Sequence, residues 1–181
     1  MTLRWKATPG PFRRGSLQLC MVMSRTKNIF GLAAFLAVCF AVSGIGGAIT
    51  ASSVGTWYQT LAKPSFNPPD WLFAPVWTTL FAMMAIAGWR VWRKIGFSGA
   101  PLAFAVYGLQ LALNLAWSGL FFGLQFVGWA LVEMSVFFVA LIATGLLFRP
   151  IDKVAALLFV PYGLWVAFAL VLNTSIWILN A

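Results

Sequence analysis

Residues 57–77 hold the side chains of this chain that are best suited to binding chemistry. Prolines alternate there with aromatic residues, with Trp57 at the start, Trp71 in the middle and Trp77 at the end. Each proline fixes its own φ and disfavours helix at the preceding residue, whereas a flexible linker is rich in Gly and Ser. A segment this stiff and this aromatic can serve as a lid over a flat, apolar ligand.

The sequence lacks the residues that several kinds of catalytic and metal site require. Histidine is absent, and Asp and Glu together number three, which excludes a Ser/His/Asp triad, zinc sites that use His and His-ligated haem iron. No nucleophile–base pair and no metal cluster stands out. Cys20 lies in a polar tail and Cys39 inside an apolar run, so we expect no disulfide between them.

The composition is that of a membrane protein of one domain. Hydrophobic residues make up 62% of the chain and charged residues 8%, whereas a soluble domain has about a quarter charged residues. A helix that crosses a bilayer needs about 20 mostly apolar residues, and five stretches meet that need. They cover residues 29–50, 74–95, 101–123, 128–148 and 154–178. The sequence therefore predicts an all-α membrane protein with a bundle of five transmembrane helices.

The positive charges gather on one side of these spans. Lysines and arginines lie in residues 1–28 and in the loops after the second and fourth spans, whereas Lys63 is alone on the other side. The positive-inside rule places the N-terminus in the cytoplasm, and the C-terminus and the segment 57–77 outside. Topology and anionic lipid then explain the net charge of +9, and we expect no binding of nucleic acid.

Residues 1–28 are basic, lack acids and show no apolar region before a small-residue cleavage site. We expect a disordered extension there, followed by the membrane domain at 29–181, and no signal peptide. A translation start at Met21 or Met23 is an alternative.

Three stretches carry a family resemblance. They read Leu61-Ala62-Lys63-Pro64-Ser65-Phe66-Asn67-Pro68-Pro69-Asp70-Trp71, Ala87-Gly88-Trp89-Arg90-Val91-Trp92 and Pro161-Tyr162-Gly163. They resemble the signature of the TspO/MBR family, the tryptophan-rich sensory proteins of bacteria and the mitochondrial translocator proteins. The likeness covers residues 29–181, with all five spans in order.

The resemblance implies a five-helix bundle with a ligand cavity that opens toward the first loop. It implies binding of porphyrins such as protoporphyrin IX and haem, as ligands and not as a required cofactor. By resemblance Trp77 and Trp165 face the ligand, and two indoles can stack on a flat tetrapyrrole. The ligand-binding residues that the resemblance implies are Tyr58, Pro68, Trp77, Phe81, Asn114, Trp117, Trp165 and Ala169.

Two polar residues within the spans leave alternatives open. Asn114 can form a hydrogen bond between helices or contact a ligand oxygen, and Gln110 shares its helix face. Glu133, near the start of the fourth span, is either a helix-start carboxylate or part of a substrate or proton relay.

The loop charges are of two kinds. Lys63 can pair with Asp70 or with a porphyrin propionate, and the residues alone do not choose between them. Asp152 and Lys153 read as ordinary loop charges, and Arg90 as an interfacial side chain that snorkels.

Small residues predict where helices pack. A row in the third span satisfies the small-xxx-small rule, and Ser43 and Gly47 mark packing in the first. The row is a candidate homodimer interface, because family members form homodimers, or else packs within the bundle. Its members are Gly108, Ala112, Ala116, Gly119 and Gly123.

Three functions fit these observations. The first is a membrane receptor or sensor for porphyrins that regulates tetrapyrrole levels or stress responses. The second is a porphyrin transporter, and the third is a tryptophan-dependent photochemical enzyme that degrades porphyrins. Thr174 and Ile178 occupy the places where animal members carry the Tyr and the basic residue of a sterol-recognition pattern, so we do not expect sterol recognition by that route. We expect residence in a bacterial inner membrane, with an outer membrane as the alternative by family analogy.

Overall fold

The computed structural model describes residues 25–181, which form helices and the turns between them, with no strand in this part of the chain. Five helical segments are long and apolar enough to cross a membrane, as the sequence predicts. The elements are α1 (Arg25–Val54), α2 (Trp57–Thr60), α3 (Asp70–Ile95), α4 (Pro101–Ser118), the π-helical turn η1 (Gly119–Gly123), which continues α4, α5 (Val127–Phe148) and α6 (Lys153–Asn180).

The first helix is longer than the predicted span at both ends. It begins at Arg25 and ends at Val54, so residues 25–28, which were expected to belong to the extension, are helical. The rest of the predicted extension lies outside the described residues. The helix continues past residue 50 through polar residues such as Thr50 and Ser52, whose hydroxyls bond to carbonyls of the same helix, those of Gly46 at 2.9 Å and Ile49 at 2.7 Å.

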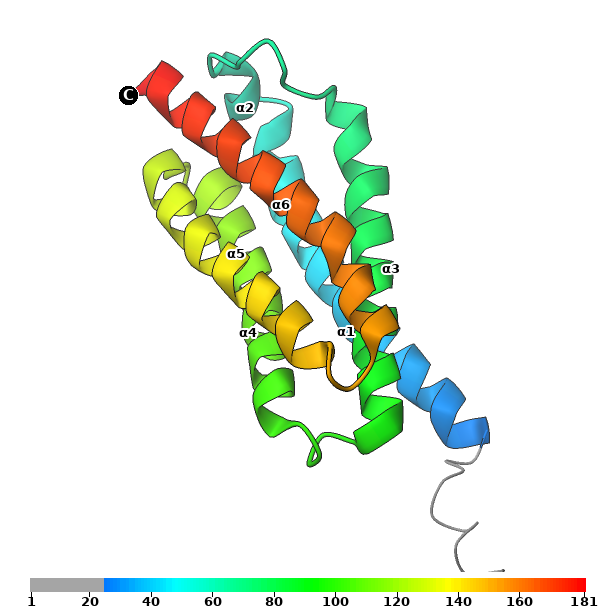
Figure 1. Ribbon diagram of the computed structural model, residues 1–181. Coiled ribbons are helices and arrows are strands. Elements are labelled where there is room, and N and C mark those ends of the chain that lie inside the picture. The colour runs from blue at the N-terminus through cyan, green and yellow to red at the C-terminus, as the bar shows by residue number, and fades with distance from the viewer. Residues whose placement is uncertain (1–24) are drawn as a thin grey trace, which may run out of the picture.

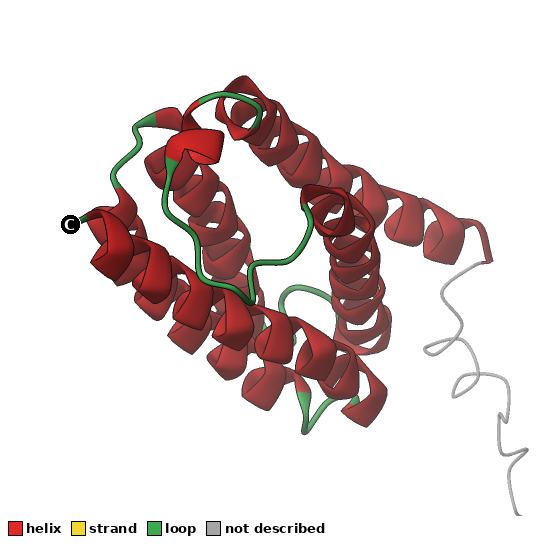
Figure 2. Ribbon diagram, turned by 90° about the horizontal axis from the view of Figure 1, so that it is seen from above, coloured by secondary structure: helices red, strands yellow, loops and turns green. Residues whose placement is uncertain are grey.

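The five long helices pack in a ring. α1 contacts α3 and α4, α3 contacts α6, α6 contacts α5, and α5 closes the ring against α4. The segment of residues 61–69 between α2 and α3, here called the lid, lies at the same end of the bundle as the C-terminal end of α6 (Figure 1). Seen along the bundle, the lid crosses over it (Figure 2). We call this the lid end, and the end with the loops 96–100 and 149–152 the basic end.

The basic half of the bundle has a solid aromatic core. The ring of Tyr107 stacks on that of Phe148 with centroids 5.7 Å apart, and Phe159 meets Phe148 edge-on at 5.7 Å. Helix termini are well defined at this end, since Gly96, with φ +66°, closes α3 and Pro101 starts α4. The buried rings hold the helices together below the site described next.

Candidate ligand-binding cavity

A cavity of about 460 Å³ lies under the lid. Its walls come from α1, α3, α4, η1 and α6, with Tyr58 of α2 at the top, and α5 contributes none of the lining. The volume falls within the range of roughly 300–1,000 Å³ typical of small-molecule sites. The five-helix arrangement therefore encloses a hollow near the first loop.

Most of the residues singled out by the resemblance line this cavity. Pro68 does not line it and lies in the lid, where its carbonyl accepts a hydrogen bond from the side chain of Asn67 at 3.1 Å. Contact of the others with a ligand stays a prediction. The residues that line the cavity are Tyr58, Trp77, Phe81, Asn114, Trp117, Trp165 and Ala169.

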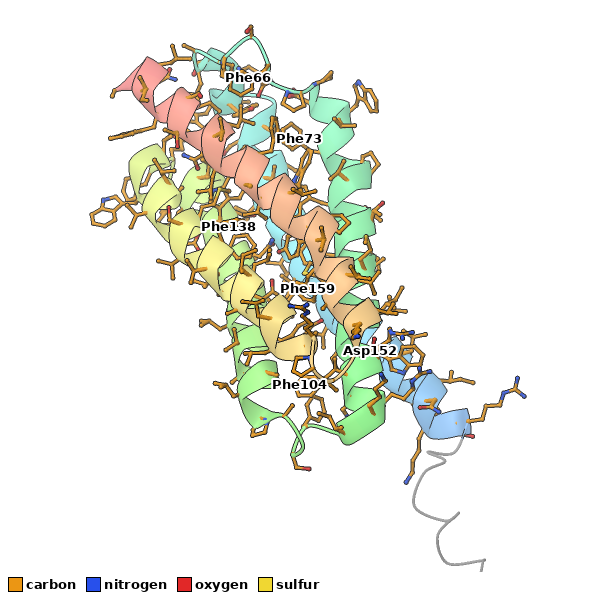
Figure 3. The ribbon with its side chains drawn as sticks, in the orientation of Figure 1. Phe66, Phe73, Phe104, Phe138, Asp152 and Phe159 are labelled. Atoms are coloured by element: carbon orange, nitrogen blue, oxygen red, sulfur yellow. The ribbon has the colours of Figure 1, made fainter. Side chains whose placement is uncertain are left out.

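The two tryptophans of interest stand on different helices and are held by neighbouring rings. Trp77 of α3 meets Tyr162 edge-on, with centroids 6.2 Å apart and planes at 81°. Trp165 of α6 meets Phe73 edge-on at 6.0 Å and 73°. Phe73 itself lies just below the lid (Figure 3). The indole Nε1 of Trp165 is buried and has no hydrogen-bond partner within residues 25–181, so it is a free donor beside the cavity.

Asn114 is tied into the bundle and also borders the cavity. Its Nδ2 donates to the hydroxyl of Tyr162 at 2.8 Å, and that hydroxyl donates to Oε1 of Gln110 at 3.4 Å. The interhelical hydrogen bond foreseen as one alternative is thus present. Asn114 is 7% exposed and lines the cavity, so a ligand contact is compatible with this bond.

Asn173 is a cavity residue for which no role was predicted. Its Oδ1 accepts from Trp117 Nε1 at 3.1 Å, and its Nδ2 donates to the carbonyl of Val127 at 3.1 Å. One amide therefore joins α6 to α4 and to the start of α5 directly at the cavity wall. An amide inside a membrane span was the available signal, as it was for Asn114.

The lid is fastened to α2 through Tyr58. The phenol donates to Oδ1 of Asn67 at 2.9 Å, and Lys63 Nζ lies 4.7 Å from the centre of the ring. Burial and the charge of Asp70 raise the pKa of Tyr58 to about 12, although the bond to Asn67 acts to lower it. The phenol is therefore a neutral hydrogen-bond donor at ordinary pH.

Lys63 does not pair with Asp70. Its Nζ donates to the carbonyls of Gln59 and Leu61 at 3.4 and 3.2 Å, while Asp70 accepts from the side chain of Gln59 at 2.8 Å. Asp70, one of the two predicted partners of Lys63, is thus bonded to Gln59 instead.

Glu133 is not a helix-start carboxylate, and the other alternative, a relay role, stays a prediction. Glu133 lies in the second turn of α5, outside the cavity lining, and both carboxylate oxygens are buried with no hydrogen-bond partner within residues 25–181. Asp152 is no ordinary loop charge, since its side chain is 2% exposed and forms ion pairs of 3.0 Å with Arg90 and with Lys94. It lies at the basic end (Figure 3).

Asp152 also caps a helix. Its Oδ1 accepts from the backbone amides of Val154 and Ala155 at 2.9 and 3.0 Å, at the start of α6. Burial alone would raise the pKa of this carboxyl, but the amide of Ala155 and the two cations lower it to about 2. Arg90 is therefore an ion-pair partner rather than a free snorkelling side chain.

The small residues of α1 serve a purpose that was not predicted. Ser43 and Gly47 were expected to mark helix packing, but both line the cavity. A Cβ placed on Gly47 would have no heavy atom within 4 Å, so this glycine does not mediate close packing.

Comparisons with known proteins agree with this architecture. The model of the TspO/MBR family matches residues 35–178. The chain is 43% identical over 158 residues to the tryptophan-rich protein TspO of Chlorobaculum tepidum, covering 85% of this chain and 98% of that one. It is 42% identical over 123 residues to the translocator protein of Sus scrofa, covering 67% and 73%. It is 39% identical over 146 residues to the tryptophan-rich sensory protein of Cereibacter sphaeroides, covering 81% and 89%. Family model and relatives together show that this multi-pass membrane protein belongs to the TspO/MBR family.

Proposed function

We propose that this protein is a membrane receptor that binds porphyrins, such as protoporphyrin IX or haem, in the cavity under the lid. The observation that carries the proposal is the wall of the cavity, where Trp77, Trp117 and Trp165 stand on three different helices around one hollow. Aromatic faces suit a large, flat π-system. Relatives named as a translocator and as a sensory protein are compatible with this role.

A few polar groups suit the carboxylates of such a ligand. Trp165 offers an unpaired N–H, and Lys63 is a cation within the lid, held by backbone carbonyls and a ring face. Polar groups that are few and well placed give orientation, while the apolar walls give affinity. We infer that the propionates lie toward the lid and the macrocycle below.

Reception is favoured over transport by the aromatic core of the basic half. Tyr107, Phe148 and Phe159 are buried and packed against one another directly on the path that a ligand would take toward the basic end. Large interlocked rings leave no channel without a rearrangement of packed helices. The cavity is therefore a pocket rather than a through-passage.

A photochemical reaction is the second candidate. Indoles that line the cavity would touch a light-absorbing macrocycle and could donate electrons to its excited state. This candidate predicts that bound porphyrin is bleached in light. Replacement of Trp77 or Trp165 by Phe should then slow bleaching more than it weakens binding.

The test is titration with protoporphyrin IX, in darkness and in light, of the wild type, Trp77→Phe and Trp165→Phe. Trp129→Phe is the matched control, because Trp129 is 69% exposed and does not line the cavity. We expect the two cavity variants to bind about 3-fold to 10-fold more weakly and the control to bind as wild type does. Equal affinity in all four proteins would show that the ligand does not occupy this cavity.

We further propose that the protein forms homodimers through the exposed face of α4. Gly108, Ala112 and Ala116 are all exposed there, and a Cβ on Gly108 would meet no heavy atom within 4 Å. Packing within one bundle does not use this part of the predicted small-residue row. Small residues let two helices approach closely within a membrane.

The distribution of charge supports an orientation. Within the described residues, Lys63 is at the lid end, whereas the other lysines and arginines lie toward the basic end. We propose that the basic end faces the cytoplasm, in a bacterial inner membrane. Labelling of Ser65→Cys but not of Ser98→Cys by an impermeant thiol reagent in intact cells, in a Cys20→Ser background, would support this orientation, and the opposite pattern would refute it.

A further inference from the structure

The wall of the cavity is closed on three sides and open on one. The lining residues of α4, η1 and α6 are buried or half-buried, and none of them is exposed. On α1 and α3, by contrast, several lining residues are exposed. They are Gly47 and Ala51 of α1 with Asp70, Ala74 and Thr78 of α3, and Asp70 is the first residue of its helix, at the lid end. A residue that lines a cavity and is exposed on the outer surface marks an opening.

This opening results from the way α1 and α3 diverge. Toward the basic end they are in close contact, since a Cβ added at Gly88 would lie 2.7 Å from Phe35, and one at Gly31 would collide with Trp92. Only glycine allows so close an approach. Toward the lid end the glycines Gly44 and Gly47 of α1 show no such contact, since a Cβ on either would meet nothing within 4 Å. The two helices separate in this direction in Figure 1.

Apart from Asp70 at the lid end, the rim of the opening is small and mostly apolar. Glycine and alanine predominate, and the hydroxyl of Thr78 is satisfied by the carbonyl of Ala74 of its own helix at 2.8 Å. The opening lies within segments long and apolar enough to cross the membrane, so its rim faces lipid. The hydroxyl of Thr50 on α1 is likewise bonded to a carbonyl of its own helix. Neither threonine therefore presents an unpaired polar group to an apolar solute that passes the rim.

The lid is held in place at several points. The lid runs across the end of the bundle (Figure 2) and is fastened by the bond of Tyr58 to Asn67. The side chain of Asn180 also holds Ala62, through two hydrogen bonds of 2.9 Å.

We propose that the gap between α1 and α3 is a lateral portal, through which an apolar ligand dissolved in the bilayer passes into the cavity without opening of the lid. The identity of the ligand rests on the proposed function, but the portal itself rests on the geometry of α1 and α3. The portal selects for solutes that partition into lipid, and it makes the membrane the reservoir from which the cavity fills.

The test narrows the portal without changing the aromatic walls. Gly47→Phe places a ring in the opening, and Gly44→Phe is the matched control, since Gly44 is on the same helix, is equally free of neighbours and does not line the cavity. Association and release of protoporphyrin IX are measured in vesicles by stopped-flow tryptophan quenching. We expect Gly47→Phe to slow association by about tenfold relative to Gly44→Phe, because a ring in the gate slows passage through it. Gly47 also lines the cavity, where the new ring takes volume from the ligand, so the association rate and not Kd is the readout.

Other outcomes overturn the portal. One is an unchanged association rate in Gly47→Phe, whether or not Kd weakens. Another is faster association in Asn180→Ala, which would place the route through the lid. Ala51→Phe, one turn further along the rim, repeats the test if Gly47→Phe does not fold.

A second measurement separates the portal from the identity of the ligand. Phosphatidylcholine with brominated acyl chains quenches tryptophan on contact, and the part due to Trp77 is the difference between wild type and Trp77→Phe. We expect that part to be present in wild type and Gly44→Phe and to fall in Gly47→Phe, even if no porphyrin binds. If the brominated lipid does not quench Trp77 in wild type, the opening does not face the bilayer and the portal is refuted. If porphyrin does not bind, only the proposed function is refuted.

Discussion

The side chain of Asn180 pairs with both backbone groups of Ala62, accepting from its N–H at 2.9 Å and donating to its carbonyl at 2.9 Å. The last turn of α6 thereby holds the lid at a residue 118 positions away in the chain. A backbone that runs over the bundle without secondary structure gains partners in this way. Lid position and the end of α6 are thus coupled.

Removal of this clamp should loosen the lid. In Asn180→Ala both hydrogen bonds are lost, and since they are exposed we expect a modest loss of about 0.5–1 kcal/mol in local stability. Hydrogen exchange of the backbone amides in residues 61–69 should accelerate, while exchange in the buried part of α4 should not change. Ser175→Ala is the control, because its hydroxyl bonds only to its own helix. Unchanged lid exchange in Asn180→Ala would show that the clamp does not restrain the lid.

Loss of the side-chain amide of Asn173 should destabilise the protein more than loss of the clamp at Asn180. Asn173 is 2% exposed and satisfies both Trp117 Nε1 and the carbonyl of Val127. Asn173→Leu leaves these two groups buried and unpaired, which costs about 1–3 kcal/mol. We expect a clear drop in Tm in detergent, whereas Thr174→Val, whose hydroxyl bonds to its own helix, should change little. A Tm for Asn173→Leu equal to that of Thr174→Val would argue against this link between helices.

The lowered pKa of Asp152 predicts that the stability of the folded protein decreases at acid pH. Its pKa is lowered in the folded protein, from 3.8 to about 2, so the folded state favours the ionised carboxylate. The stabilisation is therefore complete above the pKa of the unfolded chain and is lost as pH falls through the folded value. A shift of this size corresponds to about 2 kcal/mol at most. Between pH 5 and 2 the Tm of wild type should fall more than that of Asp152→Asn, with Lys153→Gln as a control that follows wild type. Parallel curves for wild type and Asp152→Asn would contradict the role of this carboxylate.

Much of the fold could be predicted from the sequence, because membrane spans depend on a property of each segment alone. Apolar length predicts the helices, and Pro101 and the charged loops mark where some of them begin or end. The positions of Trp77 and Trp165 on the cavity wall agree with the resemblance. These are features that local composition or a long motif specifies.

What could not be predicted depends on how helices meet. Gly31 and Gly47 are the same residue type in one helix, yet the first sits against Trp92 and the second borders an opening. Asp152 resembles an exposed loop charge until α3 brings Arg90 and Lys94 beside it. Such roles require the positions of the partner helices, which periodicity does not supply.

The exposed small residues of α4 make the homodimer testable. We expect Ala112→Trp to shift the protein from dimer to monomer in light scattering in mild detergent, because a large side chain prevents close approach of two α4 helices. Val139→Trp on α5 is the control, since Val139 is 67% exposed and distant in sequence from this face. A dimer that persists in Ala112→Trp would show that another surface joins the protomers.

Ala169 tests whether the ligand fills the cavity. It stands four residues past Trp165, one helical turn further along α6, and lines the hollow. A larger side chain there takes volume from the cavity of about 460 Å³. We therefore expect Ala169→Phe to weaken protoporphyrin IX binding by about tenfold or more, with Tm little changed, because the new ring enters empty space. Ala167→Phe, on the same helix but outside the lining, should bind as wild type does. Undiminished affinity in Ala169→Phe would mean that the porphyrin binds elsewhere on the protein, since the cavity could not hold both the new phenyl ring and the porphyrin.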